Sequence, residues 1–292
     1  MSLFFELLHS STAFLLFVLT VLGLMVGSFL NVVIHRLPIM MERQWQQECQ
    51  HVLHPEQPPE ELPVYNLAVP ASACPDCGHK IRPWENIPVL SYLLLGGKCA
   101  GCRAKIALRY PLVEAAGAIL AVAIGLTFGA SWQTLVLCPV AWALLALTMI
   151  DMDTQLLPDV ITLPLLWAGL MVNSFAVMVP LSDALWGAVG GYLTLWTVFH
   201  VFKALTGKEG MGYGDFKLLA ALGAWLGWPM LLPMIILSSL VGLVLAVGFI
   251  ALKKQARSEP MPFGPSIAIA GMIAMLWGEP LLSAYQQWLL TP

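Results

Sequence analysis

The stretch "LLAALGAWLGWPMLLPMIILSSLVGLVLAVGFIAL", residues 218–252, contains no charged residue. As a single helix it would measure about 52 Å, whereas the hydrocarbon core of a bilayer is about 30 Å thick. Pro229 and Pro233 fall where a turn between two helices is needed, because proline interrupts the helical hydrogen-bond ladder. The stretch therefore predicts two successive membrane-spanning helices.

The rest of the chain is equally apolar. Of its 292 residues, 59% are hydrophobic and only 11% are charged, with a mean hydropathy of +0.79, which excludes an ordinary soluble domain. Further apolar runs of about the spanning length lie at residues 14–34, 112–128, 134–150, 160–179, 184–202 and 267–282. We therefore predict an all-α, polytopic membrane protein with about eight transmembrane helices.

The positions of the basic residues predict the orientation. All 14 lysines and arginines fall within residues 36–109, 203–217 and 253–257, and eight crossings place these three segments on one side of the membrane. By the positive-inside rule that side is the cytoplasm, so both termini are expected outside. No basic residue precedes the first apolar run, which predicts a retained helix rather than a removable signal.

One long polar loop divides the chain. We predict a first transmembrane helix within residues 1–34, a cytoplasmic loop at 35–110 and a seven-helix membrane core at 111–292. The loop contains "CPDCGHKI" and "CAGCRAKI", and their cysteines are Cys74, Cys77, Cys99 and Cys102. Two CxxC knuckles suit a tetrahedral zinc ion with a closed, structural shell, whereas disulfides are disfavoured in a reducing cytoplasm. Cys49 and Cys138 are interpreted as passive residues.

Ionisable groups at membrane depth are the candidates for chemistry, because they are costly to desolvate. Asp151 follows the third span, and Asp215 ends "GMGYGD" at the start of the sixth. Two carboxylates at one depth form the pair that acid–base hydrolysis needs, in which one activates water and the other polarises a carbonyl. We expect the glycines to permit close backbone approach and to keep the Asp215 region from forming a regular helix.

Asp153, Asp159 and Glu114 are further candidate acids on the same side, but they and the glycines also have purely structural interpretations. Asp153 and Asp159 are explained as solvated acids, with Asp159 capping the helix that follows Pro158. Glu114 remains open between a structural hydrogen bond and a functional role, and the glycines could serve only as a turn. A phosphate loop is disfavoured, because no strand precedes the glycines and no GKS or GKT follows them.

These motifs, taken together, resemble those of the type IV prepilin peptidases. The resemblance runs nearly end to end and includes the paired CxxC knuckles. Its other segments are "GSFLNVVIHRLP" (27–38), "RPWENIPVLSYLLLGGKC" (82–99), "RYPLVE" (109–114), "IDMDTQLLPDVITLPLLW" (150–167), "TGKEGMGYGDFKLL" (206–219) and "PFGP" (262–265).

The resemblance implies an intramembrane aspartyl protease of the GxGD type, with Asp151 and Asp215 as its catalytic pair. Such enzymes of the bacterial inner membrane cut the basic leader from prepilins and pseudopilins at the cytoplasmic face. They then methylate the new N-terminal residue with S-adenosylmethionine, and the methyl-transfer positions correspond to Gly97 and Lys98. The resemblance thus chooses Asp151 over Asp153, which spacing alone leaves open, and assigns the zinc loop to methyl transfer.

Two other classes compete with this interpretation. Intramembrane acids and a glycine-entered helix also suit a proton-coupled transporter with a structural zinc site. The acids are crowded at one face, however, and no inverted repeat is evident. A membrane-anchored zinc scaffold explains the cysteines but gives the aspartates no role, and the absence of HExxH disfavours a metalloprotease.

Overall fold

The computed structural model describes residues 2–56, 63–251 and 262–290, and their regular elements are helices, accompanied by two isolated β-bridges. The chain divides into two compact units, residues 1–122 and 123–292. The first unit holds α1 (Ser2–Ser10), α2 (Thr12–Leu53), the 3-10 helix η1 (Pro83–Asn86), α3 (Leu90–Leu94) and most of α4 (Arg109–Phe128). The second holds α5 (Trp132–Thr154), α6 (Asp159–Asn173), α7 (Leu181–Thr206), α8 (Tyr213–Leu226), η2 (Trp228–Met230), α9 (Leu231–Ala251) and α10 (Gly264–Leu290).

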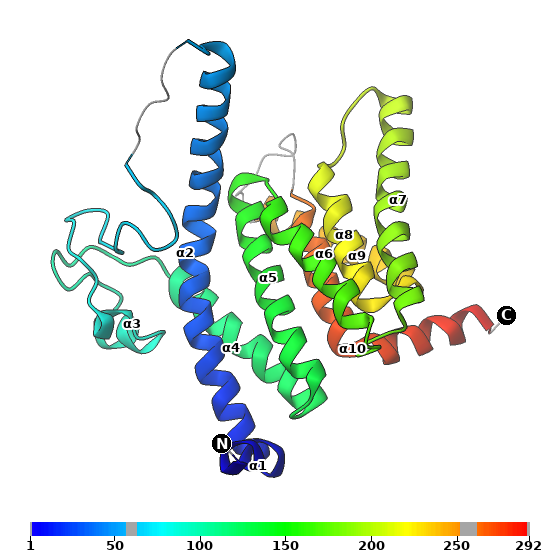
Figure 1. Cartoon of the computed structure of the whole chain (residues 1–292), viewed down its shortest axis with the longest axis horizontal. Helices are drawn as coiled ribbons and strands as arrows, with labels where there is room; N and C mark the ends of the chain where they lie inside the picture. The colour runs from blue at the N-terminus through cyan, green and yellow to red at the C-terminus, as the bar shows by residue number, and fades with distance from the viewer. Residues whose placement is uncertain (1, 57–62, 252–261, 291–292) are drawn as a thin grey trace. The chain divides into compact units, whose positions relative to one another are not determined.

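Helix α2 is much longer than the membrane span predicted at residues 14–34. It continues to Leu53 (Figure 1), so residues that were predicted only as loop extend the helix. Pro38 lies inside it, where one helical hydrogen bond is necessarily lost. The acidic, proline-rich stretch that follows falls partly at residues 57–62, outside the described residues.

Small residues bring α2 and α4 into close contact. A Cβ atom added to Gly23 would lie 2.6 Å from the Ala118 Cα, and one added to Gly27 would lie 2.6 Å from the Glu114 Cα. Glycine at these positions lets the two backbones touch, as in many membrane helix pairs. Asn31 adds a polar link, since its amide donates to the Tyr110 carbonyl at 3.1 Å.

Arg36 connects the polar loop to α2. Its side chain is buried, and its guanidinium donates to the carbonyls of Asn66 at 2.9 Å and Pro70 at 2.7 Å. A buried guanidinium needs such acceptors to offset its desolvation. Arg36 therefore fixes the 66–70 segment against the helix that leaves the predicted membrane span.

Helix α8 is the centre of the second unit. Its residues from Leu218 to Leu226 are all buried, and it packs against α6, α7 and α10 within the bundle in Figure 1. The contact with α7 is a glycine-to-glycine approach of Gly187 and Gly223. The buried Asn173 amide, at the end of α6, donates to the Ala224 carbonyl at 2.8 Å and so satisfies an acceptor at the end of α8.

The all-helical membrane fold predicted from the sequence is confirmed. Each predicted span corresponds to a helix, and the break in the 218–252 stretch falls at η2, which contains Pro229. Among the described residues six helices are long and apolar enough to cross a membrane, namely α2, α4, α5, α7, the η2–α9 segment and α10. Helices α6 and α8 have only 15 and 14 residues, so eight crossings and the orientation remain predictions.

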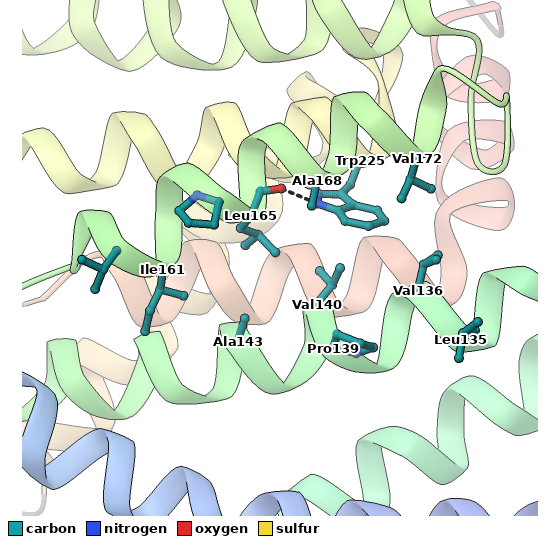
Figure 2. Close-up of a pocket in the computed structure, with 12 residues that line it drawn as sticks. Leu135, Val136, Pro139, Val140, Ala143, Ile161, Leu165, Ala168, Val172 and Trp225 are labelled. Atoms are coloured by element: carbon teal, nitrogen blue, oxygen red, sulfur yellow. Dashed lines mark hydrogen bonds between the residues drawn. The ribbon is translucent and has the colours of Figure 1, made fainter. Parts of the chain in front are cut away.

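An apolar groove of about 480 Å³ lies between α5 and α6. Figure 2 shows Val140 and Ala143 of α5 facing α6, with the Trp225 indole of α8 beside Leu165. The indole nitrogen donates to the Leu165 carbonyl at 2.9 Å. No ionisable side chain lines this groove, so it contains none of the candidate acid–base residues.

Candidate active site and metal centre

The first unit brings the four knuckle cysteines together. Their Sγ atoms all lie within 4.8 Å of one another, with Cys74 3.8 Å from Cys102 and Cys77 4.0 Å from Cys99. A tetrahedral zinc ion with bonds of about 2.3 Å requires sulfurs about 3.8 Å apart. The thiols therefore fit a closed zinc site with four cysteine ligands.

The two knuckles are built in the same way. In the first, the Cys74 N–H donates to the His79 carbonyl at 2.9 Å, and the Gly78 N–H donates to the Cys74 carbonyl at 2.9 Å. In the second, the Cys99 N–H donates to the Ala104 carbonyl at 2.8 Å, and the Arg103 N–H donates to the Cys99 carbonyl at 3.0 Å. Gly78 and Arg103 occupy matching turns with φ of 71° and 64°. Each loop thus presents two sulfurs to one point.

Backbone donors prepare one thiol for metal binding. The N–H groups of Cys102 and Gly101 point at the Cys99 sulfur, and they lower the pKa of that thiol to about 7. Zinc binds the thiolate, so a thiol that ionises near neutral pH is a better ligand.

Glu85 links η1 to the first knuckle. Its carboxylate accepts from the Arg82 backbone N–H and pairs with the His79 ring, both at 3.0 Å. The Arg82 N–H, followed by His79, lowers the pKa of Glu85 below its usual range. These contacts attach the η1–α3 segment to the cysteine cluster.

Gly97 and Lys98 lie directly before the second knuckle. Gly97 is buried with φ of 68°, and an added Cβ would lie 2.8 Å from the Tyr92 hydroxyl. Lys98 is exposed and pairs with Lys105 through an isolated β-bridge. The packing of Gly97 on Tyr92 explains the need for glycine without a cofactor, so this geometry adds no evidence for an S-adenosylmethionine site.

Glu114 has a hydrogen-bonding role in the structure. Its buried carboxylate accepts from the Val89 N–H at 2.7 Å and from the Ser28 side chain. Val89 has φ of 60°, an unfavourable value for a β-branched residue. Glu114 therefore stabilises the strained turn that begins α3.

The second unit brings Asp151 and Asp215 together. Asp151 lies in the last turn of α5 and Asp215 in the first turn of α8, and the two residues are 4% and 5% exposed. The two carboxylates interact electrostatically. Asp153, two residues farther along α5, is exposed, because successive helical residues are about 100° apart.

Each buried carboxylate accepts a hydrogen bond from a glycine N–H. Asp215 Oδ2 accepts from Gly212 at 3.1 Å, and Asp151 accepts from Gly264 at the start of α10. Asp151 Oδ2 has no hydrogen-bond partner and is buried. A buried, unpartnered carboxylate oxygen is unfavourable unless a proton, water or substrate group completes it.

The glycines of "GMGYGD" behave partly as expected. Close approach is confirmed, since a Cβ on Gly210 would lie 3.1 Å from Phe202 and one on Gly214 2.7 Å from the Leu157 Cβ. The expectation that Asp215 lies outside a regular helix is wrong. Helix α8 begins at Tyr213, because Gly212 supplies an extended residue before it and the Asp215 carboxylate satisfies the Gly212 N–H.

Asp159 is exposed, as expected for a solvated acid, but it does not cap α6. Pro158 is the residue before the helix, and Asp159 is its first residue. Both carboxylate oxygens accept from the Lys217 ammonium at 2.7 Å, which connects the starts of α6 and α8. No local sequence signal predicts this pair or the contacts of Gly264 and Leu157. The "PFGP" motif had marked Gly264, but without a role.

Comparison with known proteins identifies the family. The bacterial Peptidase A24 N-terminal domain matches residues 21–128, and the type IV leader peptidase family matches residues 135–247. Proteins named prepilin leader peptidase/N-methyltransferase are 53% identical in Aeromonas hydrophila, over 98% of both chains, and 55% identical in Pseudomonas aeruginosa, over 91% of both. One from Burkholderia pseudomallei is 50% identical over 89% of this chain and 84% of the relative. No solved structure matches. The chain therefore belongs to the type IV leader peptidase family.

Proposed function

We propose that this protein is an intramembrane aspartyl endopeptidase that removes the leader from type IV prepilins and pseudopilins and then methylates the new N-terminal amine. Relatives that match over nearly the whole chain are named prepilin leader peptidase/N-methyltransferase, and these names support both activities. The observation that carries the protease assignment is the buried pair of Asp151 and Asp215, which meets at the ends of α5 and α8. No observation favours a transporter over this assignment.

The chemistry of the pair is peptide hydrolysis. One carboxylate takes a proton from water as the water oxygen attacks the scissile carbonyl carbon, and the other, protonated, donates to the carbonyl oxygen. The leaving nitrogen then takes a proton, the C–N bond breaks, and a carboxylic acid and an amine result. The unpartnered Asp151 Oδ2 is available to hold the water.

The position of the pair suits a membrane-anchored substrate. Both aspartates lie at helix ends, which the predicted topology places at the membrane surface, and the backbone of a membrane-anchored substrate can leave its helix there. We place this face on the cytoplasmic side of the bacterial inner membrane, because all the basic residues fall on that side of the predicted topology.

The first unit is proposed to serve methyl transfer. Cys74, Cys77, Cys99 and Cys102 would hold a structural zinc ion whose closed shell stabilises a segment with little core of its own. S-adenosylmethionine is the methyl donor that we propose for the amine released by cleavage. Gly97 and Lys98 are proposed methyl-transfer positions, and no step is assigned to either.

The test is a reaction with purified full-length protein, a prepilin and labelled S-adenosylmethionine. Loss of the leader together with a labelled mature pilin is the expected result. Cleavage without label would contradict the methyl-transfer assignment, and label without cleavage would contradict the protease assignment. If neither product formed with inserted, folded protein, the whole proposal would be wrong.

A further inference from the structure

Two helices begin at the aspartate pair, and they come from distant parts of the sequence. Helix α8 begins beside Asp215, which accepts from Gly212 in its own chain segment. Helix α10 begins at Gly264, whose N–H donates to Asp151 on α5. Each carboxylate is thus held by the free N–H of a glycine at a helix start, where such donors lack an intrahelical partner.

Of the first residues of α10, Gly264 is the one whose backbone N–H is available to Asp151. The N–H groups of Ser266 and Ile267 both donate to the Phe263 carbonyl, at 3.0 and 3.2 Å, and Pro265 has no N–H. The Gly264 N–H is the backbone donor next to the Asp151 carboxylate. Pro265 also restricts the backbone conformation of Gly264, the residue before it.

Gly264 also has no room for a side chain. An added Cβ would lie 2.5 Å from Asp151 Oδ2, 3.1 Å from its Cγ and 3.1 Å from the Leu157 Cδ1. The Leu157 methyl is the end of a flexible side chain and can move. The carboxylate cannot move without leaving its hydrogen bond and its position beside Asp215.

We propose that Gly264 is a positioning residue of the protease site, an inference that rests on the proposed function. Its N–H fixes the rotation of the Asp151 carboxylate, and its missing side chain leaves the space that the unpartnered Oδ2 occupies. The "PFGP" segment then supplies a third element of the site, beside the end of α5 and the "GMGYGD" segment.

The test begins with Gly264→Ala in the full-length protein. Displacing a reacting group by about 1 Å costs about 100-fold in rate, so we expect the kcat for leader cleavage to fall by at least that factor, with KM nearly unchanged. Gly248→Ala is the matched control, because a Cβ there meets nothing within 4 Å. Wild-type cleavage by Gly264→Ala would overturn the proposal, as would an equal loss of methylation of a pre-cleaved pilin.

Two double variants identify the contact responsible. Gly264→Ala with Leu157→Ala should remain inactive, and recovery of cleavage would assign the effect to Leu157 instead. Gly264→Ala should lower the unfolding temperature less in an Asp151→Ala background than in the wild-type background, because removing the carboxylate frees the space. This cycle works even where Gly264→Ala folds poorly, and no recovery would overturn the contact with Asp151. Cleavage that survives Asp151→Asn would instead refute the proposed function and leave the packing result standing.

Discussion

The cysteine cluster and the aspartate pair are assembled in opposite ways. Each knuckle places two cysteines three residues apart on one short loop, and local backbone hydrogen bonds shape that loop. The aspartate pair has no local frame, because α5, α8 and α10 meet only when the second unit folds. We therefore expect the cysteine cluster to depend on a bound metal for its stability, and the aspartate pair to depend on buried helix packing.

The largest effect should come from removing one carboxylate of the pair. Asp215→Asn abolishes proton transfer at that position, so we expect leader cleavage to fall by at least about 10³-fold. Methylation of a pre-cleaved pilin should persist, because the proposed methyl-transfer residues belong to the other unit. Both activities are measured on one preparation, and their joint loss would show that the two sites are not separable.

Removing one of the four clustered cysteines should destabilise the first unit and leave the second unit unchanged. Cys99→Ser leaves three thiolates, so we expect zinc to be lost on dialysis against a chelator, together with the metal's contribution to folding. Cys49→Ser is the control, since Cys49 lies on α2 and outside the cluster. Elemental analysis gives the zinc content, and wild-type protein without zinc would refute the metal centre.

Lys98 tests whether charge or geometry matters beside the knuckle. If its ammonium makes a charge-assisted hydrogen bond worth about 1.5–3 kcal/mol, Lys98→Ala should lower methylation by roughly tenfold or more. Lys98→Arg should fail as well, because a planar guanidinium does not replace an ammonium. Lys105→Ala and Lys105→Arg are the matched controls, because Lys105 is the partner of Lys98 across the β-bridge. Normal methylation by both Lys98 variants would make this residue a basic anchor.

The smallest effect concerns the matched knuckle turns. Arg103 has φ of 64°, which costs an L-residue roughly 1 kcal/mol, so Arg103→Gly should be neutral or stabilising by less than about 1 kcal/mol. Gly78→Ala at the matching turn should destabilise by about 1 kcal/mol. Zinc release during thermal unfolding measures both changes. If the two turns share one design, Arg103→Gly must not destabilise the protein, and Gly78→Ala must.

The sequence predicted the elements whose signals are local. Apolar runs predicted the helices, and CxxC spacing predicted the cysteine cluster. It could not choose Asp151 over Asp153 without the family resemblance, since burial decides between them and burial depends on α8 and α10. The contact of Gly264 with Asp151 was likewise invisible, because nothing near either residue in the sequence indicates that they meet.

Helix α2 illustrates the other limit of the sequence. Its apolar run ends near residue 34, and the polar residues that follow gave no membrane signal. The helix nevertheless continues to Leu53 as a largely exposed extension. Hydropathy predicts where a helix is buried in lipid, not where its backbone ladder stops.

The most direct test of the account compares two aspartates on the same helix. Asp151 is buried beside Asp215, and Asp153 is exposed two residues later. Leader cleavage by Asp151→Asn and Asp153→Asn is measured on purified, folded protein. We expect no cleavage above background for Asp151→Asn and substantial cleavage for Asp153→Asn, whereas the reverse result would contradict the Asp151–Asp215 pair.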